Sequence, residues 1–438
     1  MEPVRRAVIT GLGPVTTIGI GKEALWSGLL SGRSAIRRLP VLPQDLTAGT
    51  SAESGIQGSG VEFFDSPSCH AKHAAWIDDF LPSQWFPPHR LKRLDRYVQF
   101  ALAASHLALE DAGLKPDPGN PSPRTGVSFG TGLGGIAHAE AQHTAFLQQG
   151  IRAITPALAF QIWGGSAHSN IAIEHGLQGP STTNSNSCAS GNVAIFDAVR
   201  FIREGLADVM IAGAAECPLA PLTFSAFDHI HTMSRWTGDP PAHACRPFHR
   251  DRDGFVMAEG AAAFVVEEYE HAKKRGARIY AEITGWSLTN EAHHMTSPRP
   301  DGAPLRAALQ QALASAKLRP EQISYINAHG SSTPANDVHE CRQLARVFGD
   351  AIKHIPISGT KACTGHTLGA AGAIEAAICL LAMENNWLPP TLHLTDPDPS
   401  LVGFDLVPLH SREIRLDHVL SNSFGFGGID SCIVLSRV

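Results

Sequence analysis

Residues 207–216 read ADVMIAGAAE, a run that is almost entirely small and apolar. The run shows no alternation of polar and apolar positions, which is typical of a strand buried on both faces. A second run of the same character, AAAFVVEE, occupies residues 261–268. Because strands become buried on both faces where helices cover a sheet on both sides, these two runs predict an α/β fold.

Strand-like runs alternate with helical patterns from here toward both ends of the chain. RYVQFALAASHLALEDAGL reads as a helix that ends at Gly113. The second half repeats the alternation, and the basic, helix-like EEYEHAKKRG at 267–276 marks the expected junction. We therefore expect mainly parallel sheets in two halves, residues 1–268 and residues 269–438.

Residues 40–76 stand apart from this pattern, because they are rich in Ser, Gly, Pro and Ala. Long stretches of this composition run over the surface of a domain rather than through its core. We expect a surface excursion here.

The composition narrows the class of protein. The net charge of −6 argues against a general nucleic-acid binder. The eight cysteines are scattered and include no CxxC, which favours reduced thiols in a cytoplasmic setting over disulfides or a zinc site. The N-terminus has no apolar signal-peptide core, and we expect no helix that spans a membrane.

Cys188 stands in NSNSCASGN, at 184–192, where a strand-like segment gives way to the amphipathic VAIFDAVRFIREG. Most cysteines are small buried hydrophobes, and that interpretation applies here too. However, the start of a helix lowers the pKa of a thiol and favours a nucleophilic thiolate. On local grounds alone the two interpretations are equally supported.

Two histidines, His329 and His366, differ from most of the 22 in the chain. Each falls at a strand end beside a Gly-rich turn, which is where α/β proteins place ligand sites. Lys361 supplies a cation close to His366 in the sequence. Glu340 lies in a predicted helix, either as a residue that orients Lys361 or His366 or as an ordinary solvated charge.

Two glycine-rich stretches remain. SFGFGG, at 423–428, permits positive φ and close backbone approach, so its backbone N–H groups can serve an oxyanion and its phenylalanines can gate a pocket or fill the core. GTGLGG, at 130–135, formally matches a dinucleotide-binding motif. The match carries little weight because the chain has 41 glycines.

Five motifs together resemble the β-ketoacyl-acyl-carrier-protein synthases, the type II condensing enzymes, over nearly the whole chain outside residues 40–76. In order along the sequence they are NSCASG, RPFHRDRDGFVMAEGAA, AHGSSTPAND, GTKACTGHTLGAAGA and SNSFGFGG. The resemblance implies the thiolase fold: two similar halves in five layers, α-β-α-β-α, the first with the nucleophilic cysteine and the second with the histidines. It also implies a homodimer, or a heterodimer, and no cofactor.

The resemblance implies roles for named residues. Cys188 takes the acyl chain as a thioester, and His329 and His366 serve decarboxylation of a malonyl unit, at least one as a neutral donor. Lys361 and Glu340 resemble a supporting ion pair. The gate and oxyanion residues are Phe426, Phe424 and Gly427, with the N–H groups of Cys188 and Phe426 as oxyanion donors, and Leu133 lines the acyl pocket.

The implied partner is an acidic acyl carrier protein, loaded with acyl or malonyl groups, and it needs local positive charge to dock. HRLKRLDR supplies Arg90, Lys92 and Arg93, which match a docking helix, and Arg235 is a further candidate; each is equally well explained as a solvated charge. No metal is expected, apart from a structural monovalent cation in some relatives, which would lie near Asn327, Glu375 and Asn422. Neither nucleic acid nor a membrane is expected as a partner.

Several positions depart from the family pattern. GGID, at 427–430, stands where Gly-Gly-Thr-Asn is usual, and Glu291 stands where an aspartate is common in the facing loop. The approach NSNSC and the long stretch at 40–76 also differ. These departures leave open a specialised relative in polyketide or polyene assembly.

Three other functions are alternatives. A thiolase acting on CoA esters needs a second cysteine near the C-terminal Gly-rich turn, where this chain has Ser423. A non-catalytic chain-length subunit characteristically lacks the active cysteine, which is retained here as Cys188. A nicotinamide dehydrogenase rests only on GTGLGG.

Overall fold

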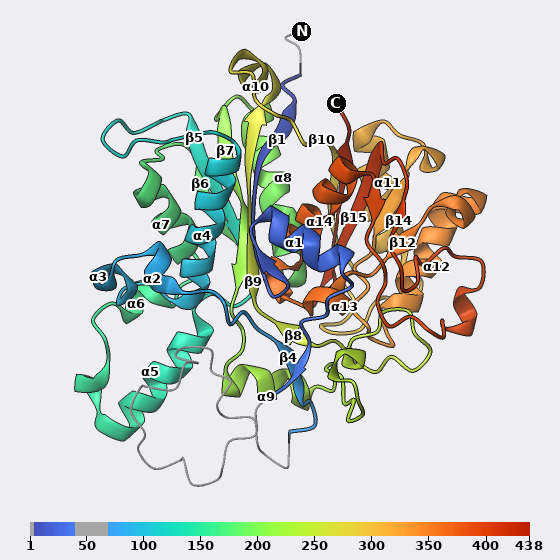
Figure 1. The fold of residues 1–438 in the computed structure, drawn as a ribbon, viewed down its shortest axis with the longest axis horizontal. Helices are drawn as coiled ribbons and strands as arrows, with labels where there is room; N and C mark the ends of the chain where they lie inside the picture. Colours follow the sequence, from blue (N-terminus) through green and yellow to red (C-terminus); the bar gives the residue numbers. More distant parts are fainter. Residues whose placement is uncertain (1–3, 40–68) are drawn as a thin grey trace.

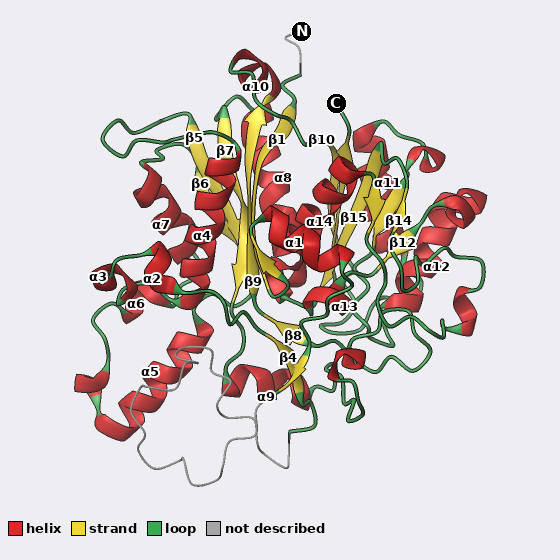
Figure 2. Cartoon of the chain, viewed as in Figure 1, coloured by secondary structure: helices red, strands yellow, loops and turns green. Residues whose placement is uncertain are grey.

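The computed structural model describes residues 4–39 and 69–438. Its central feature is a sheet of 11 strands within these described residues, formed by two five-stranded halves and the short β2 (Gly19–Ile20), which pairs with β1. Strands run through the middle of the molecule and helices lie on both sides of them (Figures 1 and 2).

The first half of the sheet has the order β1-β9-β7-β5-β6. β1 pairs antiparallel with β9, and β9 antiparallel with β7, whereas β7, β5 and β6 are parallel neighbours. In chain order, these strands are β1 (Ala7–Thr16), β5 (Thr125–Gly130), β6 (Ser181–Asn184), β7 (Val209–Glu216) and β9 (Gly260–Glu268).

The second half has the order β10-β16-β15-β11-β12. Counted along the chain within each half, both orders are first, fifth, fourth, second, third, and the parallel and antiparallel pairings also coincide. The strands are β10 (Ala281–Asn290), β11 (Tyr325–Asn327), β12 (Ile357–Ser358), β15 (His418–Gly425) and β16 (Ile429–Ser436). The sequence is thus folded twice into the same unit.

Two long helices lie between the halves. α8 (Ser190–Arg203) and α14 (Ala371–Asn385) pack against each other and against strands of both halves. Their contact is close, because a Cβ added at Gly191 would lie 2.3 Å from the Ala373 nitrogen. The short antiparallel pairing of β1 with β10 closes the junction.

The outer layers complete the α-β-α-β-α architecture. α4 (Arg96–Asp111) covers β1, β9 and β7 and contacts α7 (Ser166–His175), while α11 (Ala303–Ala316) covers β10 and β16 and contacts α12 (Asp337–Phe348). The Asp95 carboxylate accepts from the Tyr97 N–H and caps α4. The predicted five-layered thiolase fold is confirmed.

Smaller elements surround these layers. They are α1 (Lys22–Leu30), α2 (Pro82–Trp85), α3 (Pro88–Leu91), α5 (Ile136–Gln149), α6 (Leu158–Gln161), α9 (Pro221–His229), α10 (Tyr269–Lys274), α13 (Lys361–Thr364), β3 (Arg37–Arg38), β4 (His73–Ala75), β8 (Met257–Ala258), β13 (Trp387–Leu388) and β14 (Arg412–Glu413). α10 lies at the predicted junction, between β9 and β10.

Two expectations need correction, and one segment bears on the expected absence of a membrane-spanning helix. The sheet is mixed rather than mainly parallel, because burial on both faces does not fix the direction of a strand. The expected excursion at 40–76 does not include its last part, since β4 is buried and pairs with β3 and β8; residues 40–68 lie outside the described residues. One segment, Leu368–Asn385, is long and apolar enough to span a membrane, but 89% of it is buried inside the protein as the central helix.

Candidate active site

Cys188 lies between the third strand of the first half and the central helix. β6 ends at Asn184, and a single 3-10 turn, Ser187–Ala189, leads into α8. Ser187 has a φ of 52°, a left-handed conformation that serine rarely adopts, so the backbone bends sharply just before the cysteine. The thiol therefore stands at the start of the helix, as the sequence predicts.

The polar approach NSNSC holds this bend. The Asn184 side-chain amide donates to the Ser190 carbonyl at 3.2 Å, and the Asn186 amide donates to the Asn184 side-chain oxygen at 3.1 Å. The Ser185 hydroxyl donates to the Gly132 carbonyl at 3.0 Å. The asparagines and serines of this stretch thus join the cysteine turn to the GTGLGG turn.

Burial governs the Cys188 thiol. The residue is 6% exposed, and desolvation raises the pKa of the thiol to about 11. The Ser187 hydroxyl, the Lys361 ammonium and the Phe426 N–H, which is hydrogen-bonded to the thiol, oppose that rise with smaller effects. The expectation that the helix start lowers this pKa is wrong, because desolvation outweighs the helix end.

His329 follows β11 and is held as a neutral imidazole. Its Nδ1 lies 3.5 Å from the Lys361 Nζ. An ammonium group can only donate, so Nδ1 accepts and the ring proton is on Nε2. Burial, with the charges of Lys361 and His366, holds the His329 pKa well below its usual range. His329 is therefore a hydrogen-bond donor at Nε2.

His366 does not stand at a strand end, as predicted, because the short helix α13 separates it from β12. Its backbone is bonded to the Val256 carbonyl at 2.7 Å and to the Ala258 N–H at 2.9 Å. The two histidine rings are 5.4 Å apart between centroids, edge to face. Burial is the main cause of a His366 pKa well below the usual range, with a further contribution from Lys361. Both imidazoles are thus neutral near pH 7.

The partner of Lys361 is Glu375, not Glu340. The Lys361 Nζ lies 2.5 Å from a Glu375 carboxylate oxygen and also donates to the His329 carbonyl at 2.5 Å. Glu340 instead accepts the backbone N–H groups of His329 at 2.9 Å and Gly330 at 3.0 Å. The predicted Lys361–Glu340 ion pair is wrong, because Glu340 on α12 supports the backbone of the histidine turn.

The hairpin between β15 and β16 brings SFGFGG to the cysteine. A Cβ added at Gly425 would lie 3.1 Å from the Cys188 nitrogen, so glycine permits the close approach. The turn itself uses Gly427 and Gly428 at φ of 87° and 72°. The Phe424 ring lies 5.7 Å from the His329 ring, and the Phe426 ring stacks on Phe227 at 6.1 Å.

One cavity, of about 310 Å³, brings Cys188, His329 and His366 together. Phe424 and Phe426 also line it. The cavity thus joins the cysteine from one half of the duplicated fold and the two histidines from the other.

Sequence reasoning missed Glu216, at the end of β7. Its buried carboxylate accepts the N–H groups of Gly132 at 2.5 Å, Leu133 at 3.1 Å and Gly369 at 3.0 Å. Burial raises its pKa to about 7. Glu216 fixes Leu133, which packs against the apolar cluster that contains Cys188. The one sequence signal was an acid that ends a wholly buried run.

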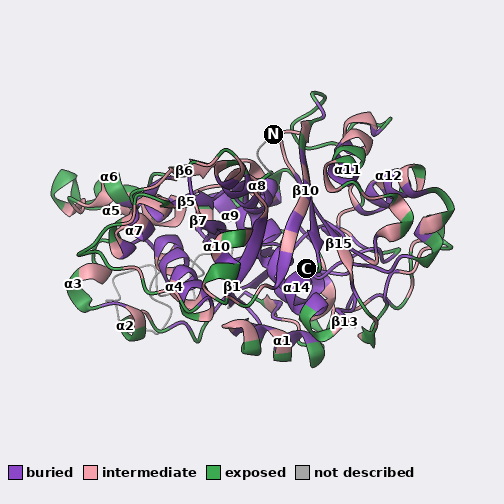
Figure 3. Cartoon of the chain, turned by 90° about the horizontal axis from the view of Figure 1, so that it is seen from above, coloured by how far each residue is buried: buried purple, intermediate pink, exposed green. Residues whose placement is uncertain are grey.

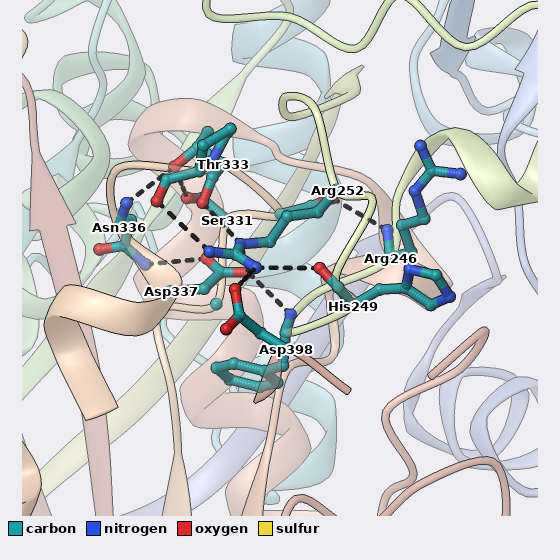
Figure 4. A network of polar contacts seen from close by, with 12 residues as sticks. Arg246, His249, Arg252, Ser331, Thr333, Asn336, Asp337 and Asp398 are labelled. Atoms are coloured by element: carbon teal, nitrogen blue, oxygen red, sulfur yellow. Dashed lines mark hydrogen bonds and ion pairs between the residues drawn. The ribbon is translucent and has the colours of Figure 1, made fainter. Parts of the chain in front are cut away.

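A second polar network holds the loop that follows His329 (Figure 4). The Arg252 guanidinium donates to the Thr333 carbonyl at 3.1 Å and to the Asp398 carboxylate at 2.9 Å. Asp337, at the start of α12, lies 3.7 Å from the same guanidinium and accepts the Phe248 N–H at 2.9 Å. Arg252 therefore fastens one wall of the cavity, which includes Thr333.

The residues suggested for a monovalent cation fit that group. Asn327 Oδ1, Glu375 Oε2 and Asn422 Oδ1 are each buried without a hydrogen-bond donor among the described residues. Carboxylate and amide oxygens suit a hard cation. Elsewhere in the described residues, no group of three or more His, Cys, Asp or Glu is arranged to hold a metal ion.

The predicted docking residues differ in accessibility. Arg90 forms an ion pair with Glu174, whereas Lys92 and Arg93 are exposed in the turn after α3, so no continuous helix carries all three. Arg235 is exposed, and its guanidinium contacts His231, which lines the cavity.

The whole chain is similar to known condensing enzymes. Residues 4–272 match the family described as "Beta-ketoacyl synthase, N-terminal domain", and residues 280–395 match "Beta-ketoacyl synthase, C-terminal domain". A 3-oxoacyl-[acyl-carrier-protein] synthase 2 of Coxiella burnetii is 39% identical over 434 residues, 99% of each chain. The granaticin polyketide putative beta-ketoacyl synthase 1 of Streptomyces violaceoruber is 38% identical over 99% of this chain and 98% of its own.

Solved structures of ketosynthases are similar to this chain over its whole length. A type II polyketide ketosynthase, in complex with its acyl-carrier protein and bound to a hexaketide, superposes with a TM-score of 0.86 at 33% identity, covering all of both chains. The ishigamide ketosynthase/chain length factor gives a TM-score of 0.87 at 31% identity, again over all of both chains.

Proposed function

The chain belongs to the β-ketoacyl synthase family, and from that membership we propose how its residues carry out the reaction. The enzyme condenses a cysteine-bound acyl chain with malonyl-ACP, releases CO₂ and forms 3-oxoacyl-ACP in fatty-acid or polyketide elongation. The observation that carries the residue roles is the meeting of Cys188, His329 and His366 in one cavity, with the Phe426 N–H on the thiol.

Cys188 performs the first step. Its sulfur attacks the thioester carbonyl of the acyl carrier protein, its proton passes to a neutral imidazole and then to the departing carrier thiol, and the acyl chain remains on Cys188. The Cys188 and Phe426 N–H groups stabilise the carbonyl oxygen as it gains charge. Because burial raises the pKa of the thiol, this step depends on a proton acceptor in the cavity.

His329 and His366 perform the second step. The malonyl thioester oxygen lies against the imidazoles, which stabilise the enolate as the carboxylate leaves as CO₂. His329 donates from Nε2. The enolate carbon attacks the acyl carbonyl on Cys188, the C–S bond breaks, and the Cys188 thiolate takes up one proton from water for each CO₂ released. Neutral imidazoles suit this step because a charged imidazolium would form an ion pair with the malonyl carboxylate and hold it in its ground state. A neutral imidazole still donates a hydrogen bond to the enolate oxygen.

The alternatives fit less well. A thiolase needs a second cysteine beside the Gly-rich turn, and among the described cavity-lining residues Cys188 is the one cysteine. A dinucleotide needs free N–H groups in the GTGLGG turn, but those of Gly132 and Leu133 are bonded to Glu216. A non-catalytic subunit has no use for the bend and the hydrogen bonds that hold Cys188.

Intact mass spectrometry tests the proposal. The protein is incubated with carrier-protein thioesters from acetyl to palmitoyl. We expect a mass gain of one acyl group on Cys188, lost in Cys188→Ala and kept in Cys69→Ala, a matched buried cysteine. Stable acylation at another residue, or at none across the panel, would contradict the assignment.

The acyl carrier protein is the proposed partner, consistent with the related ketosynthase that is solved with one. Lys92, Arg93 and Arg235 are exposed cations that suit an acidic surface; Arg90 contributes less because Glu174 neutralises it. Arg235→Glu, which reverses the charge of the side chain, should raise KM for acyl-ACP without changing kcat. An unchanged KM would show that Arg235 is not part of the docking surface.

We propose a homodimer. Strand β6 is a sheet edge, and α5, of 14 residues, has no buried residue in the described chain. Exposed apolar side chains gather on this side, namely Leu147, Ile151, Phe160, Trp163 and Ile173. Figure 3 shows α5, α6 and α7 together at the β6 end of the molecule. Such a surface is normally covered by a partner.

Three further expectations remain proposals. Residues 1–268 and 269–438 are the two halves, which the repeated strand order supports. A monovalent cation held by Asn327, Glu375 and Asn422 would satisfy buried oxygens that have no hydrogen-bond donor. A Tm that is equal in KCl and in tetramethylammonium chloride would contradict this proposal.

A cytoplasmic location agrees with eight buried, unpaired cysteines. Fractionation of cells that express the protein tests it.

A further inference from the structure

The turn that carries Phe426 is fastened to the segment that follows β10. The Gly427 N–H donates to the Met295 carbonyl at 2.8 Å, and the Glu291 N–H donates to the Gly428 carbonyl at 2.7 Å. The Asn290 side-chain amide donates to the Gly427 carbonyl at 2.9 Å. Because Phe426 directly precedes Gly427, these three bonds set the position of the N–H group that contacts the Cys188 thiol.

Two buried acids lie beside this fastening. Glu291 is 3% exposed and Asp430 is 4% exposed, and both line the active-site cavity. A Cβ added at Gly428 would lie 2.9 Å from the Glu291 Cβ, so Glu291 is in contact with the turn. Asp430 stands opposite Phe424 in the β15–β16 register and opposite Thr289 in β10.

One carboxylate oxygen of this pair has no hydrogen-bond partner among the described residues. A Glu291 oxygen accepts the Arg299 N–H at 2.8 Å. Asp430 is bonded to Thr289, whereas its Oδ2 is buried without a partner among the described residues. A buried anionic oxygen without a donor is costly, so the surroundings favour a protonated Asp430.

The surrounding charges do not neutralise the pair. The Arg299 guanidinium is bonded to Asp301 rather than to either acid. Arg299 and His293 lower the pKa of Glu291, but burial raises it by more. Glu340, on α12, adds a further negative charge toward Asp430. Burial, together with the Glu291 charge, raises the pKa of Asp430 to about 8, and burial also raises that of Glu291.

We propose that Glu291 and Asp430 are positioning residues that keep the Phe426 turn closed over Cys188 while one of the two carboxyl groups holds a proton. Loss of that proton places two negative charges beneath the turn, in buried surroundings of low dielectric constant. Their repulsion loosens the three hydrogen bonds that join the Phe426 turn to the segment after β10. The inference rests on the proposed function, because it takes the Phe426 turn to serve Cys188.

The first test is the pH profile of condensation with malonyl-ACP and the acyl-ACP that loads best. We expect kcat of the wild type to fall at least threefold between pH 7 and pH 9. The fall should disappear in Asp430→Asn and in Glu291→Gln, because each variant retains a single carboxylate. Glu270→Gln, an exposed acid on α10, should keep the fall. The same alkaline fall in all four proteins would overturn the proposal.

The second test needs no turnover. A carboxyl whose pKa is raised by folding loses stability as the pH rises from its unfolded pKa toward its folded pKa. The Tm advantage of Asp430→Asn over the wild type should therefore grow between pH 5 and pH 8, by about 2 °C or more, and then level off. A pH-independent difference would overturn the inference. Absence of condensation at every pH would count against the proposed function. The Tm comparison would still decide whether Glu291 and Asp430 share a proton, because it does not depend on turnover.

Discussion

Burial decides the chemistry of single residues in this site. The same desolvation that raises the pKa of Cys188 to about 11 holds the pKa values of His329 and His366 well below their usual range. The site therefore contains a thiol and two neutral imidazoles near pH 7. It is set for proton transfer from the first to the second, rather than for a permanent thiolate–imidazolium pair.

Replacing either histidine should separate the two steps. His329→Ala and His366→Ala should each slow malonyl decarboxylation at least 100-fold and Cys188 acylation less than 10-fold, because an enolate needs the donors more than a thioester does. His354→Ala, at an exposed residue of the 3-10 segment that follows α12, is the control. Mass spectrometry of acylation and release of labelled CO₂ measure the two steps. Failure of both variants at acylation alone would reverse the assigned roles.

The lowered histidine pKa values also predict a pH dependence. A group whose pKa is lowered on folding stays neutral until the pH falls well below 6.5, so decarboxylation should be level between pH 6 and pH 7.5. Stability should decline as the pH falls below 6.5, because the unfolded chain then binds protons that the native site refuses. A decarboxylation rate that halves near pH 6.5 would contradict the neutral buried imidazoles.

Glu340 offers a test of backbone support. Glu340→Gln places an amide donor where a carboxylate oxygen accepts N–H groups of the His329–Gly330 turn. One unsatisfied buried donor costs about 1–3 kcal/mol, and a displaced histidine slows catalysis by about 100-fold. Glu413→Gln, at an exposed acid of β14, should change neither value. Urea unfolding and kcat measure both effects.

Sequence reasoning found the residues that stand at strand ends and missed those defined by tertiary contact. Cys188 and His329 follow strands, as predicted, whereas His366 was expected at a strand end and instead follows the short helix α13. The pairing of Lys361 with Glu375, rather than with Glu340, depends on how α13 and α14 pack. Glu216 was missed because its role lies in three backbone N–H groups from two distant loops.

At the scale of elements, the apolar runs predicted strands but not their direction. ADVMIAGAAE and AAAFVVEE became antiparallel neighbours, β7 and β9. Burial on both faces arises here from the central helices on one side and α4 on the other, and it is the same for either direction. The amphipathic and apolar helix patterns were reliable, because helix boundaries follow local signals such as Gly113, which has a φ of 66°.

The close contact of α8 with α14 predicts a stability effect. Gly191→Ala would push a Cβ to within 2.3 Å of the Ala373 nitrogen, so the two central helices must separate. Overpacking of this kind costs about 1–3 kcal/mol, more than the gain in helix propensity. Gly164→Ala is the control, since its added Cβ meets no atom closer than 3.4 Å. If Gly191→Ala and the wild type had equal unfolding midpoints in urea, α8 and α14 could separate without loss of stability, which would contradict this prediction.

At the scale of the whole molecule, the duplication explains how the site is assembled. Cys188 lies between the third strand of its half and α8, and His366 lies between the third strand of its half and α14. The His329 turn follows a second strand, as the GTGLGG turn does in the first half. One pair of equivalent loops carries Cys188 and His366, and the other pair carries His329 and the Leu133 turn. Cys188, His329 and His366 line the cavity, whereas Leu133 packs against the apolar cluster that contains Cys188.

The face at the β6 edge predicts the state of assembly. Phe160 is 72% exposed and Ile173 is 73% exposed, and a homodimer would bury both. Sedimentation of the purified chain should give twice 46.7 kDa. Phe160→Glu with Ile173→Glu should give the single mass, because two charges in an apolar interface cost more than the contact supplies. Val402→Glu, at a residue that is 86% exposed, should stay dimeric. A wild-type monomer, or a dimer that survives both charges, would place the interface elsewhere.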